Sequence, residues 1–245
     1  RMSAAVLFGS FFVLLLLTVP IGYAIGISSL IAIYYFSDIP LIIIAQKSIT
    51  GVDSFPLLAI PFFMLAGNLM SSGGIARRLV NFFDALIGHV TGGLGMVTII
   101  VCMFFAAISG SAVATVSAVG AFMIPEMVDH GYNKPFSAAL TAAAGTIGVI
   151  IPPSIPFVIY GVVSGTSITD MFTAGFMPGI MMGAALMIVC YFVSKKNGYR
   201  GKEKASSAKE IWVAFKDAFW AILSPVIILG GIYSGFFTPT EAAVI

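Results

Sequence analysis

Residues 90–125 read VTGGLGMVTIIVCMFFAAISGSAVATVSAVGAFMIP, a stretch of 36 residues without a charged side chain. The polar tripeptide Ser109-Gly110-Ser111 lies near its middle. A second uncharged stretch follows and is interrupted by Gly145-Thr146-Ile147-Gly148 and by Ile151-Pro152-Pro153-Ser154. Such residues free backbone groups that lipid cannot satisfy, so these breaks are tolerated only where they line a cavity or are buried in protein. The two breaks are therefore the first candidates for a functional site.

The composition predicts an all-α polytopic membrane protein that lies in a lipid bilayer. Hydrophobic residues make up 59% of the chain and charged residues only 9%, against roughly 25% charged residues in soluble domains. Cys102 and Cys190 both lie inside apolar runs, where a free cysteine behaves as a small hydrophobic residue. We therefore expect neither a disulfide nor a metal cluster, no removable targeting segment, and no binding of nucleic acid.

The uncharged intervals can be measured against the bilayer, whose core of about 30 Å needs about 20 apolar helical residues. Residues 4–36 predict one long span bent near Pro20, and residues 54–76 predict a second crossing. Residues 79–90 predict a helix lying on the membrane surface, because apolar and polar positions alternate at helical spacing. Residues 171–194 predict a span of normal length, and residues 218–240 begin another apolar region.

Length and charge together predict that residues 91–127 form a re-entrant hairpin. Halved at the Ser-Gly-Ser break, this stretch gives segments of about 17 residues, at the short limit for crossing a bilayer. The segment from Lys195 to Asp217 holds seven of the twelve basic residues, which predicts a cytoplasmic loop over residues 195–216. Arg77-Arg78 and Lys134 fall on this same side only if the hairpin enters and leaves the membrane there. Residues 135–169 are again too long for one span and predict a broken helix.

A faint internal repeat links residues 18–24, TVPIGYA, with residues 237–243, FTPTEAA. Transporters are commonly built from inverted repeats that leave weak symmetry of this kind. We therefore expect the chain to hold the first repeat and the truncated start of a second one.

The two breaks offer neutral oxygen ligands. A proline cannot donate to the carbonyl four residues before it, so Pro152, Pro153 and Pro156 release the carbonyls of Gly148, Val149 and Pro152. Together with the hydroxyl groups of both breaks, this set suits Na⁺, as in transporters whose unwound carbonyls hold that ion, whereas divalent ions normally require carboxylates. The hydroxyl groups are those of Ser109, Ser111, Thr115 and Thr146.

The charge pattern favours sodium over proton coupling, because neither break contains the Asp, Glu or His of a proton relay. An anionic substrate could be held by the positive ends of the helices that begin near Ala112 and Ser154.

The glycines, serines and apolar spans also allow other interpretations, namely helix packing, a protease or a channel. Gly92, Gly93, Gly95, Gly179 and Gly183 are expected to serve close helix packing alone. An intramembrane serine protease using Ser109 or Ser111 would need a histidine at similar depth, yet the histidines lie at the ends of segments. A channel would need a repeated or oligomeric ring for its filter.

Five segments resemble the large membrane subunit of TRAP (tripartite ATP-independent periplasmic) transporters, and they occur in the order found in that family. They are PFFMLAGNLM at 61–70, GGIARRL at 73–79, SGSAVA at 109–114, IPPSIP at 151–156 and FTPTEA at 237–242.

The resemblance implies an elevator-type carrier made of inverted repeats. Residues 1–90 would form scaffold and interfacial arm helices, and residues 91–170 half of a transport domain, with the hairpin over 91–127 and the broken helix over 135–169. Residues 171–217 would add a span and the basic loop, and residues 218–245 would start the second repeat. The second hairpin and its ion site would lie outside this chain.

The resemblance also implies the function, that of a sodium-coupled importer subunit and not an enzyme. Its partners would be a small membrane subunit and a periplasmic binding protein that delivers a small organic anion, a C4-dicarboxylate or sialic acid, to a bacterial inner membrane. A sodium-coupled anion carrier without a binding protein is the alternative. The implied Na⁺ ligands are Ser109, Ser111, Gly145, Gly148, Val149 and Pro152, and the implied substrate contacts are Gly110, Ala112, Thr115, Thr146, Pro153 and Ser154.

Overall fold

The computed structural model describes residues 2–37, 39–202 and 204–244. All regular secondary structure in these ranges is helical. Four helical segments are long and apolar enough to cross a membrane, namely Phe55–Ser72, Ala112–Asp129, Ile168–Asn197 and Ala208–Tyr233. The predicted class, an all-α polytopic membrane protein, is confirmed. The chain divides into two units, Arg1–Ser54 and Phe55–Ile245.

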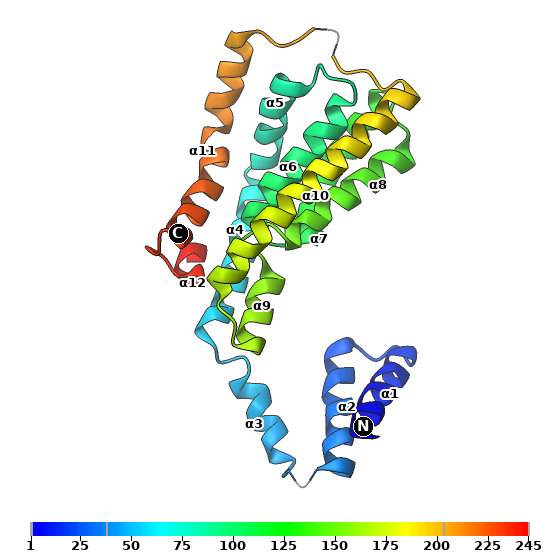
Figure 1. Ribbon diagram of the computed structural model, residues 1–245, viewed down its shortest axis with the longest axis vertical. Helices are drawn as coiled ribbons and strands as arrows, with labels where there is room; N and C mark the ends of the chain where they lie inside the picture. Colours follow the sequence, from blue (N-terminus) through cyan, green and yellow to red (C-terminus); the bar gives the residue numbers. More distant parts are fainter. Residues whose placement is uncertain (1, 38, 203, 245) are drawn as a thin grey trace. The chain divides into compact units, whose positions relative to one another are not determined.

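The first unit contains α1 (Met2–Leu16), α2 (Ile21–Phe36) and α3 (Ile42–Thr50). The prediction of one span bent at Pro20 is wrong, because α1 and α2 pack side by side as a helical hairpin (Figure 1). Thr18 turns the chain with a φ of 60°. Pro20 then precedes the first residue of α2, where its missing N–H costs no helical hydrogen bond.

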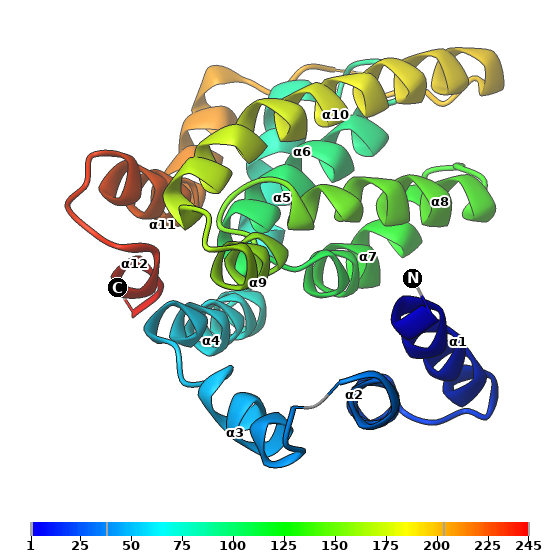
Figure 2. The ribbon, with the colours of Figure 1, turned by 60° about the horizontal axis from the view of Figure 1, so that its bottom comes forward.

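The second unit is arranged around one central helix, α6. Figures 1 and 2 show its neighbours on several sides, and α4, α5, α7, α8, α10 and α11 all contact it. Val97, Cys102 and Phe105 of α6 are accordingly fully buried. In chain order the elements are η1 (Phe55–Leu58), α4 (Ala59–Ser72), α5 (Ile75–Ile87), α6 (Gly93–Ser109), α7 (Ala112–Asp129), α8 (Lys134–Gly145), η2 (Thr146–Val149), α9 (Ile155–Ser164), α10 (Ile168–Asn197), α11 (Ala208–Tyr233) and α12 (Pro239–Val244).

The predicted hairpin is present as a helix–turn–helix made of α6 and α7. Gly110 makes the turn with a φ of 61°, a conformation that glycine adopts without steric cost. The two helices run back alongside each other, since the Thr98 hydroxyl lies 3.6 Å from the sulfur of Met127. The entry of this hairpin into the membrane from one side stays a prediction.

Within the residues predicted to form a broken helix, two helices are separated by a short turn. Helix α8 ends at Gly145, the short turn η2 follows, and α9 begins at Ile155. Between η2 and α9 the chain becomes extended at Ser154, with φ −129° and ψ 120°.

Helix α5 is strongly amphipathic, but its apolar side is covered by protein. Ala76, Leu79, Val80 and Phe83 are buried, because α5 packs against α6 and α11. Its Arg78 also forms an ion pair with Asp217 of α11 at 3.8 Å.

The basic segment is shorter as a loop than predicted. Residues 195–197 complete α10, and α11 already begins at Ala208. The start of α11 is fixed by a capping box, in which Ser207 accepts from the Glu210 amide and the Glu210 carboxylate accepts from Ser207. Such reciprocal bonds satisfy amides that would otherwise lack a partner. Among the described residues of this segment, 198–202 and 204–207 remain as a loop.

Residues 199–202 of this loop, here named the strap, cross the base of the hairpin. The Gly92 amide donates to the Tyr199 carbonyl at 3.1 Å, and the Lys202 amide donates to the Gly88 carbonyl at 2.9 Å. The Tyr199 hydroxyl accepts from the Asn133 amide at 3.1 Å. Its ring stacks on Tyr132 with centroids 4.4 Å apart. The strap thus joins the end of α10 to both ends of the hairpin.

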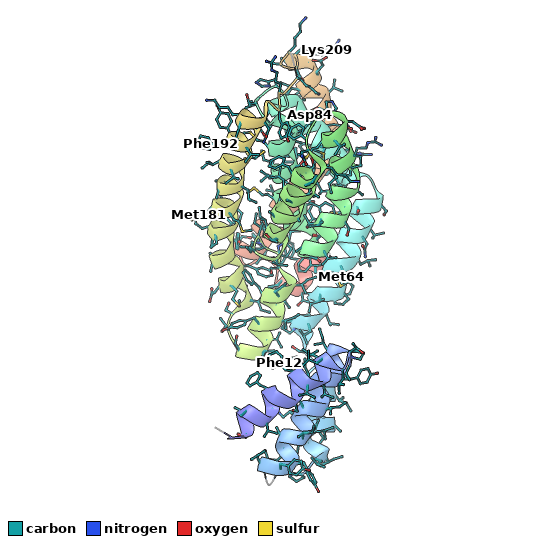
Figure 3. All side chains as sticks on the ribbon, turned by 90° about the vertical axis from the view of Figure 1, so that its right-hand side faces the viewer. Phe12, Met64, Asp84, Met181, Phe192 and Lys209 are labelled. Atoms are coloured by element: carbon teal, nitrogen blue, oxygen red, sulfur yellow. The ribbon has the colours of Figure 1, made fainter. Side chains whose placement is uncertain are left out.

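The glycines assigned to packing do allow close helix contacts. A Cβ added at Gly95 would lie 2.5 Å from the Cys190 sulfur, and one at Gly92 would lie 2.5 Å from the Ser194 hydroxyl. Gly179 and Gly183 lie against Ile151 and Met103, and Gly93 against Gly88. Met181 and Phe192 on α10 instead point away from the unit (Figure 3).

Candidate functional site

The tip of the hairpin is docked on the break of the second helix. The Gly110 carbonyl accepts a hydrogen bond from the Ile155 amide at 3.2 Å. A Cβ on Gly110 would lie 2.8 Å from the Pro153 carbonyl oxygen, so no larger residue fits. The two breaks, 45 residues apart from Gly110 to Ile155 in the sequence, therefore form one site.

Buried hydroxyl groups gather at this contact. The Ser109 hydroxyl lies 3.1 Å from the Thr115 hydroxyl, and Thr115 donates to the Ser111 carbonyl at 2.8 Å. Ser109 is 2% exposed and Thr115 is fully buried. The Ser111 hydroxyl accepts from the Ala114 amide at 3.4 Å and so caps α7. Three of the predicted oxygen-bearing residues are thus brought together by one turn of chain.

Two glycines of the broken helix let it approach this cluster. A Cβ on Gly148 would lie 2.8 Å from the Thr115 hydroxyl and 3.0 Å from the Ser111 carbonyl. Ala112 is in the same contact, with its Cα 3.1 Å from that position. Gly145 lies against Val116 in the next turn of α7. Small residues are required here because the two backbones pass so close.

The Val149 and Pro152 carbonyls, which the prolines leave without a helical partner, differ in their hydrogen bonding. The Val149 carbonyl accepts from the Ser154 hydroxyl at 2.7 Å, and this hydroxyl in turn accepts from the Phe157 amide at 3.4 Å. Pro152 and Pro153 are buried. Within the described ranges the Pro152 carbonyl receives no hydrogen bond. The Val149 carbonyl, one of the predicted ligands, is therefore occupied by the protein itself.

Thr146 does not join the cluster. Its side chain is exposed, and its hydroxyl donates to the Ala143 carbonyl at 2.7 Å. Conversely, Gly67 of α4 lies at the site although the sequence analysis gave it no role: a Cβ there would lie 3.1 Å from the Ser109 Cβ. Its place inside the family segment at 61–70 was the available signal.

The chemistry of the site is that of neutral oxygens. Among the described residues, no three His, Cys, Asp or Glu side chains lie close enough to hold a metal ion. The hydroxyl and carbonyl groups of the site suit a monovalent cation better than a divalent one. Two helices, α7 and α9, also begin here, and helix N-termini favour negative charge.

Comparisons with known proteins agree with one another over most of the chain. Residues 8–245 match the model of the family described as "Tripartite ATP-independent periplasmic transporter, DctM component". The chain is 50% identical to an isethionate TRAP transporter permease protein, DctMQ, of Oleidesulfovibrio alaskensis over 97% of its length. It is 41% identical to the C4-dicarboxylate large permease protein DctM of Rhodobacter capsulatus over 99% of its length, and 45% identical to the sialic acid large permease protein SiaM of Vibrio cholerae over 95%.

The match covers only part of each relative, namely 38% of DctMQ, 58% of DctM and 54% of SiaM. These relatives are transporter permeases and not enzymes, which sets aside the protease interpretation. The order of hairpin, break and apolar helices extends over the same residues as the family match. The chain belongs to the DctM component family of tripartite ATP-independent periplasmic transporters.

Proposed function

We propose that the chain provides the first half of the membrane pathway in a sodium-coupled importer of small organic anions. Its partners are a small membrane subunit and a periplasmic binding protein, and its place is the bacterial inner membrane with residues 198–207 in the cytoplasm. The hairpin and the broken helix move together as an elevator between the two membrane faces.

The observation that carries the sodium assignment is the contact between Gly110 and Ile155. It places the Ser109 and Thr115 hydroxyls beside the break, and among the described residues the Pro152 carbonyl of that break receives no hydrogen bond. Neutral oxygens at unwound helix ends are a recurrent way of binding Na⁺ in transporters. The absence of carboxylates from both breaks argues against a divalent ion.

The anion assignment rests on the ends of two helices. Helices α7 and α9 both begin at the site, after Ser111 and Ser154, and the positive end of a helix dipole attracts negative charge. The relatives are named for isethionate, C4-dicarboxylates and sialic acid, all of which are anions at neutral pH. We propose a substrate of this class for the present protein.

The test is sodium-dependent uptake by the full-length complex in vesicles, with the binding protein present. Ser109→Ala and Thr115→Val each remove one hydroxyl, and we expect the sodium concentration for half-maximal uptake to rise about tenfold or more, since ~1.4 kcal/mol of binding energy is a factor of ten. Ser164→Ala and Thr173→Val remove exposed hydroxyls of α9 and α10 and serve as matched controls.

Unchanged sodium dependence in both site variants would disprove the sodium assignment. Uptake of equal rate without the binding protein would instead favour a carrier that needs none. Flux that does not saturate and continues without sodium would indicate a channel.

A further inference from the structure

Helix α4 touches the tip of the hairpin through Gly67. This glycine is buried together with Ala59 and Phe63, and residues four positions apart lie on the same face of a helix. Ala59 and Phe63 pack in one cluster with Val158 of α9, whereas Gly67 lies against Ser109 at the end of α6. A single face of α4 therefore contacts both the broken helix and the hairpin tip.

The Ser109 hydroxyl points away from α4. A Cβ on Gly67 would lie 3.1 Å from the Ser109 Cβ and 3.2 Å from its Cα, whereas the hydroxyl oxygen of Ser109 lies more than 4 Å from that position. On its far side this oxygen is 3.1 Å from the Thr115 hydroxyl. A side chain on residue 67 would therefore press the Ser109 hydroxyl toward Thr115.

The helix α4 has little freedom to retreat from the tip. Its buried face is held by the cluster around Phe63, and α5, which follows it, packs against α6. The tip is bonded in turn to the break, through Gly110 and Ile155. Because close-packed interiors transmit strain, Ser109 would yield to a side chain on Gly67 by a few tenths of an ångström.

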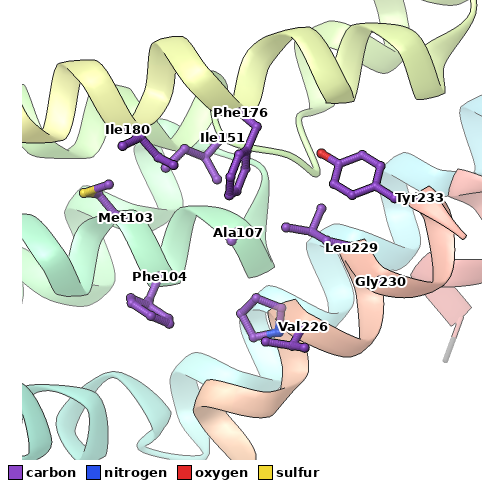
Figure 4. A pocket seen from close by; sticks show the side chains of 11 residues that line it. Met103, Phe104, Ala107, Ile151, Phe176, Ile180, Val226, Leu229, Gly230 and Tyr233 are labelled. Carbon is purple, nitrogen blue, oxygen red and sulfur yellow. The ribbon is translucent and has the colours of Figure 1, made fainter.

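Another side of α6 borders an apolar cavity of about 580 Å³. Figure 4 shows Met103, Phe104 and Ala107 of α6 at this cavity, opposite residues of α10 and α11. None of the oxygen-bearing residues of the hydroxyl cluster lines it. The contact between Gly67 and Ser109 is therefore independent of whatever fills that space.

We propose that Gly67 is a positioning residue, which sets how far the Ser109 hydroxyl reaches into the cluster and thereby which alkali cation the cluster accepts. This inference rests on the sodium site proposed above. A side chain on residue 67 would shorten the distance between the Ser109 and Thr115 oxygens and favour Li⁺, the smaller ion, over Na⁺. Distances from a metal ion to its ligands are defined to within about 0.2 Å, so a shift of this size changes the preference.

Gly67→Ala is the test variant, because its methyl group is the smallest side chain that reaches Ser109. Alanine also has a higher helix propensity than glycine, which favours an intact α4. Gly120→Ala is the matched control. Gly120 is buried within α7, and a Cβ there would lie 3.2 Å from a methyl carbon of Thr141 in α8. The two substitutions thus introduce equally close contacts, but only the first one presses on the hairpin tip.

The experiment measures thermal unfolding of the purified full-length protein with its small subunit. The concentration of NaCl or LiCl is varied, and choline chloride keeps the ionic strength constant. A cation that binds only the folded protein raises its stability, and the concentration dependence gives an apparent dissociation constant. We expect Gly67→Ala to lower the ratio of the Li⁺ constant to the Na⁺ constant by about threefold or more, since binding sites tolerate displacements of only about 0.5 Å. Gly120→Ala should leave the ratio unchanged.

A double-mutant cycle with Ser109→Ala separates positioning from packing. Alanine keeps the Cβ on which the new methyl group presses, but it lacks the hydroxyl oxygen. In this background Gly67→Ala should no longer change the ratio of the two constants. A residue that served packing alone would lower the unfolding temperature in both backgrounds and leave the ratio as it is.

Three outcomes would overturn the role of Gly67 and leave the sodium site in place. They are an unchanged ratio in Gly67→Ala, an equal change of the ratio in the Ser109→Ala background, and loss of folding in Gly67→Ala. A different result would refute the sodium site and this inference together: Ser109→Ala and Thr115→Val binding both cations as tightly as the parent protein.

Discussion

Ser154 uses one hydroxyl group for two tasks. It donates to the Val149 carbonyl that a proline has released, and it accepts from the Phe157 amide at the start of α9. It is fully buried. A single side chain thus satisfies both sides of the break, which explains how a buried turn can contain two consecutive prolines.

We expect Ser154→Ala to lower the free energy of unfolding by about 1–3 kcal/mol, because a buried carbonyl and a helix cap both lose their partner. The measurement is thermal or denaturant unfolding of the purified protein. Ser164→Ala removes an exposed hydroxyl near the other end of α9, and its effect should stay within about 0.5 kcal/mol. Equal losses in the two variants would contradict the role given to Ser154.

The buried hydroxyl of Tyr132 should make the stability of the protein depend on pH in the alkaline range. It lies in the turn after α7, and burial raises the pKa of its hydroxyl from 10.0 to about 12. Its contribution to stability is complete below the unfolded pKa near 10 and is lost as pH rises toward 12, since the unfolded chain ionises first. Thermal unfolding between these pH values should therefore change less with pH in Tyr132→Phe than in the parent protein. Identical pH profiles would refute this expectation.

For single residues, the sequence predicted which ones belong to the candidate site better than it predicted where their side chains point. Ser109, Thr115 and Gly148 lie close together, and the sequence singled them out because breaks in apolar helices are visible in the composition; their roles as ligands stay predictions. Thr146 does not lie with them, since neighbouring helical positions differ by about 100° around the axis and only packing decides which of them faces the hairpin. Gly67 was missed because a contact between distant helices leaves no local pattern.

Among the elements, the hairpin of α6 and α7 and the broken helix were predictable from length and charge. The error at α1 and α2 has a local cause. A proline inside an apolar run is compatible with a kink or with a complete break of the helix. The turn at Thr18 could not be predicted from the sequence, because threonine seldom adopts a positive φ.

The strap is the element whose role is easiest to measure. Tyr199→Phe removes only the acceptor for the Asn133 amide, whereas Tyr199→Ala also removes the stack on Tyr132. We expect Tyr199→Ala to destabilise the protein by at least about 0.5–1.5 kcal/mol more than Tyr199→Phe, since an aromatic pair is worth that much beyond the area that it buries. The measurement is unfolding of both variants, with and without Tyr132→Leu. An additive result in this double-mutant cycle would exclude the stack as a source of stability.

For the whole molecule, the distribution of basic residues predicts which end of α10 faces the cytoplasm. Ala205→Cys lies in the basic loop and Thr166→Cys precedes α10, and both positions are exposed. The two natural cysteines are buried and need not be removed. With a membrane-impermeant thiol reagent on intact cells that have a permeabilised outer membrane, we expect labelling of Thr166→Cys but not of Ala205→Cys. The reverse pattern would overturn the orientation inferred from the positive-inside rule.

The contact between Gly110 and Ile155 limits how the whole molecule can admit a substrate. If the hairpin tip moved away alone, the Gly110 carbonyl and the Ile155 amide would lose each other where water is scarce, and an unsatisfied backbone group in such surroundings costs several kcal/mol. The tip is thus latched to the break. In the elevator movement proposed above, the hairpin and the broken helix would travel together, so the hydrogen bond between Gly110 and Ile155 would stay intact.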